Sequence, residues 1–227
     1  LISGQLQFGS LNQYLYKNYF CDTSLSVIGT IAQYAPLVLM LPFSGKIVKK
    51  YGKKEICGVT SFVAAAAAVA TFFIKPAPDQ AWLFLVMQFV IGFGYSFVSI
   101  TNWAIITDVI DYQEYKTGIR SESAVYAVYT FCRNLGQTLA DTGGITLLSK
   151  IAGYNGETMA DAGYISGVGE GILTVCTIIP AIVYTLVFLI FKFGYNLDMG
   201  KLDVMYKALA LKKNQTAGEE DLTRNPQ

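Results

Sequence analysis

The sequence predicts an all-α membrane protein, a bundle of six transmembrane helices, and three observations support this fold class. Hydrophobic residues make up 53% of the 227 residues and charged residues only 15%, and the mean hydropathy of +0.41 exceeds what a water-exposed surface usually tolerates. The apolar residues gather in blocks about as long as a bilayer crossing, which takes roughly 20 residues. Lysines cluster in one connection between these blocks, as orientation signals of membrane proteins do.

The opening stretch "LISGQLQFGSLNQYLYKNYF" has no initiator Met and no cleavable signal pattern, and we interpret it as most or the end of one helix cut at its start. Pro36 and Pro42, and in a later span Gly92 and Gly94, predict kinks and close helix contacts, which neighbouring helices can accommodate. The five further spans cover residues 25–44, 56–74, 81–106, 123–151 and 171–191.

The Lys-rich connection "GKIVKKYGKKE" sets the predicted topology, because the positive-inside rule places such a segment in the cytoplasm. Alternation then puts "KPAPDQ" and the long connection before residue 171 outside. Residues 1–195 are expected to form the membrane bundle, and residues 196–227 a cytoplasmic tail. In the tail, Leu202, Met205, Tyr206 and Leu209 recur at helical spacing, which predicts a short amphipathic helix on the inner membrane surface. Disorder is expected beyond Asn214.

Several function classes are excluded or disfavoured by composition. The chain has no His, so a His-based metal site, a catalytic triad and an imidazole relay are excluded within it. Its four Cys are far apart, its net charge is only +1 and it has no phosphate-binding glycine motif, which argues against a zinc site, nucleic acid and ATP-driven pumping. We therefore expect no catalytic residue, metal or cofactor, and transport or structural roles remain.

The span over residues 123–151 carries a polar row. Arg133 lies roughly 18 Å beyond Ser121 at helical rise, near the middle of the bilayer. A charge at that depth costs at least ~2.5 to 3.5 kcal/mol on insertion scales, so it should face protein or water. Gln137 and Asp141 follow Arg133 at helical spacing, and Thr130 and Asn134 belong to a second row beside them. The charges could simply neutralise partners within the bundle, but the accompanying uncharged groups favour a solute pathway.

The preceding span adds hydrogen-bonding groups and an indole, including Asn102 and Trp103. Such a set suits a sugar, whose hydroxyls need hydrogen bonds and whose apolar ring face can lie on an aromatic side chain. A tryptophan that serves only as a membrane-interface anchor is the alternative for Trp103.

The densest charge lies in "TDVIDYQEYKTGIRSESAVY", the cytoplasmic connection between these two spans. Two Asp at i and i+3 are expected to continue the first helix, and Glu122 to begin the next near its positive dipole end. Charges at this inner mouth could pair with another helix bundle and separate when the mouth opens, as a reversible gate, although an ordinary polar loop is also possible. The predicted gate residues are Asp108, Asp111, Glu114, Arg120 and Glu122.

The run Asp108-x-x-Asp111-Tyr112-x-Glu114-Tyr115-Lys116-x-Gly118-x-Arg120-x-Glu122 resembles the signature between the tenth and eleventh helices of a known family. This family is the glycoside-pentoside-hexuronide cation symporters, the melibiose permease group of the major facilitator superfamily. The Lys-rich connection and the Gly153-Tyr154 end of the later span agree with it. The resemblance extends from about Tyr14 to Leu209 and implies the C-terminal half, helices seven to twelve, of a twelve-helix transporter.

The resemblance implies alternating access around a central sugar and cation site. The coupling cation, Na⁺ or H⁺, would be bound mainly by an N-terminal six-helix bundle that this sequence lacks. A family lysine corresponds to Asn134, with Arg133 one residue before it, and sugar-side positions correspond to Tyr129 and Thr130. The expected substrate pathway is Tyr129, Thr130, Arg133, Asn134, Gln137, Asn102 and Trp103.

The function expected from these features is secondary transport of a sugar, namely a glycoside, pentoside or hexuronide, coupled to Na⁺ or H⁺. The expected setting is a bacterial plasma membrane, with the C-terminus in the cytoplasm. The expected partners are the sugar, the cation, the lipid bilayer and the N-terminal bundle, with no nucleic acid. The alternative is a membrane sensor or assembly subunit that keeps the transporter fold without transporting. An embedded enzyme is a distant third, because no base, nucleophile and orienting group lie together.

Overall fold

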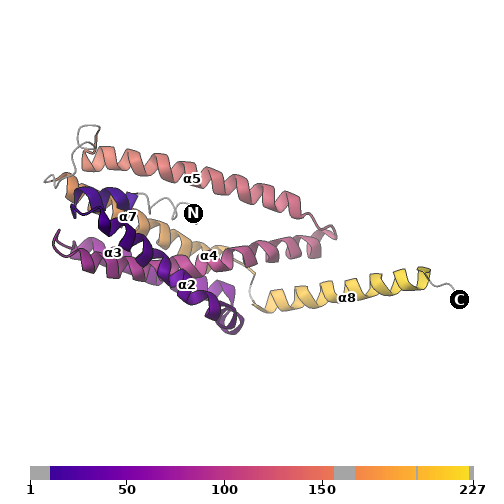
Figure 1. Cartoon of the computed structure of the whole chain (residues 1–227). Coiled ribbons are helices and arrows are strands. Elements are labelled where there is room, and N and C mark those ends of the chain that lie inside the picture. Colours follow the sequence, from indigo (N-terminus) through magenta and orange to yellow (C-terminus); the bar gives the residue numbers. More distant parts are fainter. Residues whose placement is uncertain (1–10, 156–166, 198, 225–227) are drawn as a thin grey trace.

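The computed structural model describes residues 11–155, 167–197 and 199–224, and within these ranges every regular element is helical. This confirms the all-α prediction. Residues 11–18 form a helical segment ahead of the first complete helix. The elements that follow are α2 (Ser24–Tyr51), α3 (Lys53–Ile74), α4 (Ala81–Thr117), α5 (Glu122–Ala152), α7 (Val168–Leu189), the short π-helix η1 (Ile190–Gly194) and α8 (Met199–Arg224) (Figure 1).

Four helices of the described residues are long and apolar enough to cross a membrane. They are α2, α3, α4 and the continuous segment Val168–Gly194. Helix α5 has 31 residues and is long enough, but it does not reach the same apolar level. The polar row that includes Arg133 and Asp141 lowers its hydropathy. The fifth predicted span is thus a helix of the right length with an unusually polar composition.

Helix α4 lies at the centre of the packing, with α2 on one side and α3 on the other, and α3 also packs on α7. The core at one end of the bundle is built around Leu15, Phe84 and Ile172, which are almost completely buried. The opening segment therefore belongs to the bundle. Helix α5 contacts mainly α7, and Figure 1 shows that it runs along the outside of the other helices.

Glycines allow α4 to approach its neighbours closely. A Cβ at Gly92 would collide with the backbone carbonyl of Gln33 in α2, and one at Gly94 would lie 2.8 Å from the carbonyl oxygen of Thr60 in α3. Small residues at such contacts let membrane helices pack by backbone approach. The close contacts predicted from Gly92 and Gly94 are confirmed.

We expect Gly92→Ala to lower the free energy of unfolding by about 1 to 3 kcal/mol, because backbone has to move to admit the new methyl group. Thermal unfolding of the purified protein in detergent measures this. Gly45→Ala is the matched control, since nothing lies within 4 Å of the added Cβ, and it should be neutral or slightly stabilising. Equal stability of the two variants would contradict the close packing of α4 on α2.

The Lys-rich connection differs from its predicted form. It is expected as a loop after residue 44, but α2 continues to Tyr51 and α3 begins at Lys53. Only Gly52 separates the two helices, with a φ of 87° that favours glycine. The lysines of this segment have good helix propensity and their long side chains can reach water from a helix surface. We call this end of the bundle the Lys-rich end, defined by Lys49, Lys50, Lys53 and Lys54.

The tail also differs. Helix α8 extends from Met199 to Arg224, whereas a short helix and disorder beyond Asn214 are expected from the sequence. Residues such as Ala, Glu and Leu in its second half favour a helix even without a packed face. Figure 1 shows α8 at the end of the bundle where α4 meets α5.

Candidate functional site

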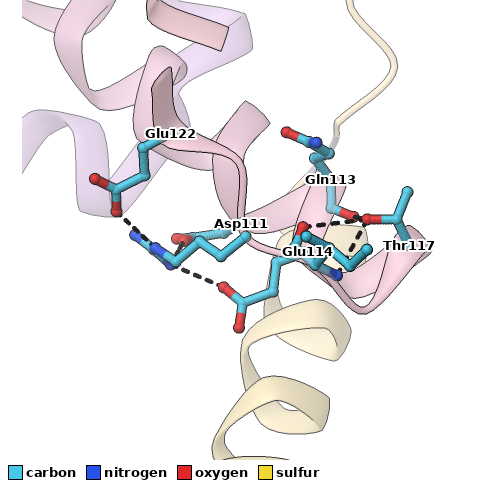
Figure 2. Close-up of polar contacts among 7 residues, drawn as sticks. Asp111, Gln113, Glu114, Thr117 and Glu122 are labelled. Carbon is cyan, nitrogen blue, oxygen red and sulfur yellow. Dashed lines mark hydrogen bonds and ion pairs between the residues drawn. The ribbon is translucent and has the colours of Figure 1, made fainter. Parts of the chain in front are cut away.

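An ion cluster occupies the turn between α4 and α5. The Arg120 guanidinium bonds three carboxylates: its Nε lies 2.6 Å from Glu122, and its Nη1 lies 2.9 Å from both Asp111 and Glu114. Figure 2 shows these carboxylates converging on one guanidinium. Asp111 and Glu114 belong to the last turns of α4, and Glu122 begins α5. Four of the five predicted gate residues therefore lie together.

Local sequence explains why Arg120 turns back toward α4. Gly118 ends α4 with a φ of 74°, in the left-handed region, and its N–H bonds the carbonyl of Glu114. The Thr117 hydroxyl donates to the carbonyl of Gln113 and accepts from the N–H of Ile119. The chain reverses direction within a few residues after this turn. The Arg120 side chain therefore reaches Glu114 and Asp111, which lie one and two turns back from the end of α4.

The electrostatics of the cluster favour a charged arginine. Hydrogen bonds to Glu122, Glu114 and Asp111, in decreasing order of effect, raise the pKa of Arg120 above its usual value. Because three carboxylates surround one guanidinium, the cluster keeps a net negative charge. Arg120 and Glu122 are well exposed, so salt should weaken these pairs. Asp111 and Glu114 are less exposed, at 14% and 27%, so the pair with Glu122 is the one that water can replace most easily.

Asp108, the fifth predicted gate residue, lies in a separate and buried contact. Its side chain is 1% exposed, and its oxygens accept from the Lys53 ammonium at 2.7 and 2.6 Å. The Tyr206 hydroxyl donates to the same carboxylate at 2.6 Å. Lys53 also donates to the carbonyl of Ala104 at 3.2 Å. We call Lys53, Asp108 and Tyr206 the Asp108 contact.

This contact differs from what the sequence suggests, because gate acids are expected to pair with another helix bundle. Asp108 instead has partners on α3 and α8 of its own chain. Sequence reasoning missed the roles of Lys53 and Tyr206. Lys53 is one of several orientation lysines, and Tyr206 is one of several residues at helical spacing. Neither pattern identifies a partner 55 or 98 residues away.

The predicted pathway residues of α4 and α5 meet at one point. The Asn102 amide donates to the Tyr129 hydroxyl at 2.8 Å, and the rings of Trp103 and Tyr129 lie 6.0 Å apart. Trp103 is 56% exposed, whereas Asn102 and Tyr129 are half-buried. The three side chains present two aromatic rings, an amide and a hydroxyl on one surface. We call Asn102, Trp103 and Tyr129 the aromatic–amide group.

The remaining pathway residues lie farther along α5. Thr130, Arg133 and Asn134 are exposed and Gln137 is half-buried. The buried residues of α5 lie near its other end, at Gly144, Leu148 and Ala152. The middle of α5 is therefore largely uncovered, along its polar row and also at apolar residues such as Phe131 and Leu139, while its far end is anchored to the bundle. The structure brings Asn102, Trp103 and Tyr129 together and leaves the other four beside them on α5.

A hollow of about 640 Å³ adjoins the ion cluster. Asp111, Glu114 and Arg120 line one side, and α8 lines the other with Tyr206, Leu209, Ala210 and Lys212. Among the described residues, no group of three or more His, Cys, Asp or Glu side chains could hold a metal ion.

The described geometry is that of a helical membrane bundle with a polar helix, and comparisons with known proteins agree. Residues 4–199 match the model of a family described as MFS/sugar transport protein. A protein of Escherichia coli (strain K12), provisionally named a sulfoquinovose importer, is 28% identical over 82% of this chain and 38% of its own length. The symporter YjmB of Bacillus subtilis (strain 168), named as uncharacterized, is 29% identical over 79% of this chain and 38% of its own length.

A third relative, the inner membrane symporter YicJ of Escherichia coli (strain K12), is 30% identical over 70% of this chain and 34% of its own length. The chain thus spans less than two fifths of the length of these relatives. No solved structure matches it significantly. The matched family consists of transporters, which confirms the expectation that the chain is not an enzyme.

Proposed function

Because the chain belongs to the MFS/sugar transport protein family, we propose that it forms half of a secondary transporter in which a coupled Na⁺ or H⁺ drives a sugar across the membrane by alternating access. The chain is an integral, multi-pass membrane protein with helices suited to this task. The observation that carries the proposal is the aromatic–amide group, which offers a stacking surface and hydrogen-bonding groups to one solute.

The polar surface of α5 supports a pathway beside this group. Thr130, Arg133 and Asn134 are exposed, and a charge at membrane depth is costly against lipid. Under this proposal an N-terminal six-helix bundle covers that surface and leaves a water-filled passage. The coupling cation is held mainly by acids of that bundle.

The proposed solute class is based on Arg133 and on one relative. Arginine presents a planar fork that binds carboxylate or sulfonate oxygens in pairs, so Arg133 favours a sugar that carries an acidic group. One relative is provisionally named for import of the sulfonated sugar sulfoquinovose. We therefore place sulfonated sugars and hexuronides first among the candidate solutes, ahead of neutral glycosides and pentosides.

Uptake by the full-length transporter in proteoliposomes tests the proposal. We expect accumulation of at least one sugar of a panel containing sulfonated, uronic and neutral members, driven by an imposed Na⁺ or H⁺ gradient. Thr130→Leu and Asn134→Leu should each abolish most uptake by filling the passage. Thr185→Leu in α7 is the control, because Thr185 is also exposed but bonds only its own helix in the described contacts. No accumulation under any gradient would reject coupled transport and favour the alternative, a membrane sensor or assembly subunit that does not transport.

The Arg120 cluster is proposed to lie at the cytoplasmic mouth in a bacterial plasma membrane, since the Lys-rich end marks that side. We expect Arg120→Gln to shift the transporter toward its inward-open state, because the three ionic contacts that hold the α4–α5 turn in place at this mouth are lost together. Labelling of cysteines near this mouth from the cytoplasmic side should become faster. Lys116→Gln, which removes a neighbouring exposed charge, should have little effect. Raising ionic strength should partly mimic Arg120→Gln, and unchanged labelling would contradict the gate.

A further inference from the structure

The tail helix α8 is held against the bundle at two places. Near its start, Met199 lies against Gly52, where an added Cβ would be 3.0 Å from the Met199 side chain. One and a half turns later, Met205 is 2% exposed, so its side chain is buried in protein. A helix that merely lay on the membrane surface would turn its apolar residues toward lipid. Met205 shows that α8 uses part of its apolar face to dock on the bundle.

The polar anchor of this docking is Tyr206. Its hydroxyl donates to Asp108 Oδ1 at 2.6 Å, and Asp108 is 1% exposed. Tyr206 is 43% exposed as a whole, but desolvation, followed by the hydrogen bond to Asp108, raises the pKa of its hydroxyl. The hydroxyl therefore keeps its proton at physiological pH and remains a donor. A hydrogen bond to a charged acceptor is stronger than one between neutral groups.

Several charged groups surround the Tyr206 hydroxyl and its acceptor Asp108. Lys53 from α3 bonds the same carboxylate at 2.6 Å, so Asp108 joins α3, α4 and α8 at one point. On the other side of Tyr206, Asp111, Glu114 and Arg120 line the 640 Å³ hollow whose opposite wall is α8. The place where α8 docks therefore fixes one wall of the space next to the ion cluster.

We propose that Tyr206 is a positioning residue, which anchors the tail helix to Asp108 and thereby makes α8 a wall of the cytoplasmic mouth. The tail helix then takes part in opening and closing this mouth. The anchoring stands on the contacts alone, whereas its effect on transport rests on the proposed function.

Tyr206→Phe in the full-length transporter tests both parts, because phenylalanine keeps the ring and removes the donor. Hydrogen–deuterium exchange over residues 199–212 reports the docking directly and needs no solute. We expect exchange there to rise about tenfold or more, from the loss of a hydrogen bond to a charged group. Tyr51→Phe is the matched control, since Tyr51 lies at the same end, is 56% exposed and has no hydroxyl hydrogen bond in the described contacts.

The link to Asp108 is tested by a double variant. If Tyr206 acts through this carboxylate, Tyr206→Phe should raise exchange little further when Asp108→Ala, which removes the acceptor, is already present. In proteoliposomes, Tyr206→Phe should lower the maximal uptake rate at least severalfold with little change in KM, because solute contacts are intact. A residue that only supported folding would instead lower the amount of active protein, which the yield of folded transporter reports.

The outcomes are separable. Exchange no greater than in Tyr51→Phe, or fully additive with Asp108→Ala, would overturn the anchoring. Raised exchange with an unchanged uptake rate would overturn the claim that the tail positions the gate. If the unmodified transporter moves no sugar at all, the proposed function fails, while the exchange measurement still decides whether Tyr206 anchors α8.

Discussion

Asp108→Ala is expected to lower the free energy of unfolding of the bundle by about 2 to 4 kcal/mol, because it leaves the Lys53 ammonium without its counterion. Asp108 is 1% exposed and Lys53 is 20% exposed, so water can replace the lost carboxylate only in part. The same change removes the acceptor of Tyr206. Chemical or thermal unfolding of the full-length protein in detergent measures the loss.

The tail provides a matched control for this effect. Asp203 pairs with Lys207 at 2.8 Å, nearly the same distance, but both side chains are largely exposed. Asp203→Ala should therefore change stability by no more than a few tenths of a kcal/mol. If the two variants lost the same stability, burial of the Asp108 contact would be contradicted.

Trp103→Ala is expected to reduce uptake at low solute concentration by roughly tenfold to a hundredfold. The change removes the larger ring of the aromatic–amide group, and covering a sugar face with an indole contributes about 1.5 to 3 kcal/mol. Trp103→Phe should retain much of the uptake, because it keeps an aromatic surface. Initial uptake rates in proteoliposomes, normalised to folded transporter, give the comparison.

Trp82 is the control for Trp103, because it is the other tryptophan of the chain and is similarly exposed, at 64% compared with 56%. It lies in the first turn of α4, where tryptophan commonly anchors a helix at the membrane interface. Trp82→Ala should leave uptake within about twofold. Equal losses in the two variants would mean that Trp103 is also only an anchor, which is the alternative that the sequence leaves open.

The helices could be predicted from sequence because lipid imposes a strong and local rule. Apolar blocks long enough to cross the bilayer must be helical, since no water satisfies their backbone groups. The rule placed α3 and α4 within a few residues of their observed starts, at Lys53 and Ala81. The rule was weakest at the Lys-rich end, where polar residues continue the helices beyond the apolar blocks. This explains why α2 and α8 extend farther than expected.

The site could be predicted only where its residues are close in sequence. Asp111, Glu114, Arg120 and Glu122 meet because one tight turn joins two helices, and Gly118 marks that turn. Asn102 was predicted from the polar groups of its span and Tyr129 from the family resemblance, and the two meet because they lie on neighbouring helices. The Asp108 contact depends on how α3 and α8 pack, which is a tertiary property that no local pattern of Lys53 or Tyr206 encodes.

The most direct test of the central claim is solute protection at Asn134. In the full-length transporter with other accessible cysteines replaced, Asn134→Cys should react rapidly with a membrane-impermeant thiol reagent, and the transported sugar should slow that reaction. Leu139→Cys, on the same helix and 65% exposed, should react slowly and be unaffected by sugar. Equal, solute-independent reaction at both positions would contradict a water-filled sugar passage along α5.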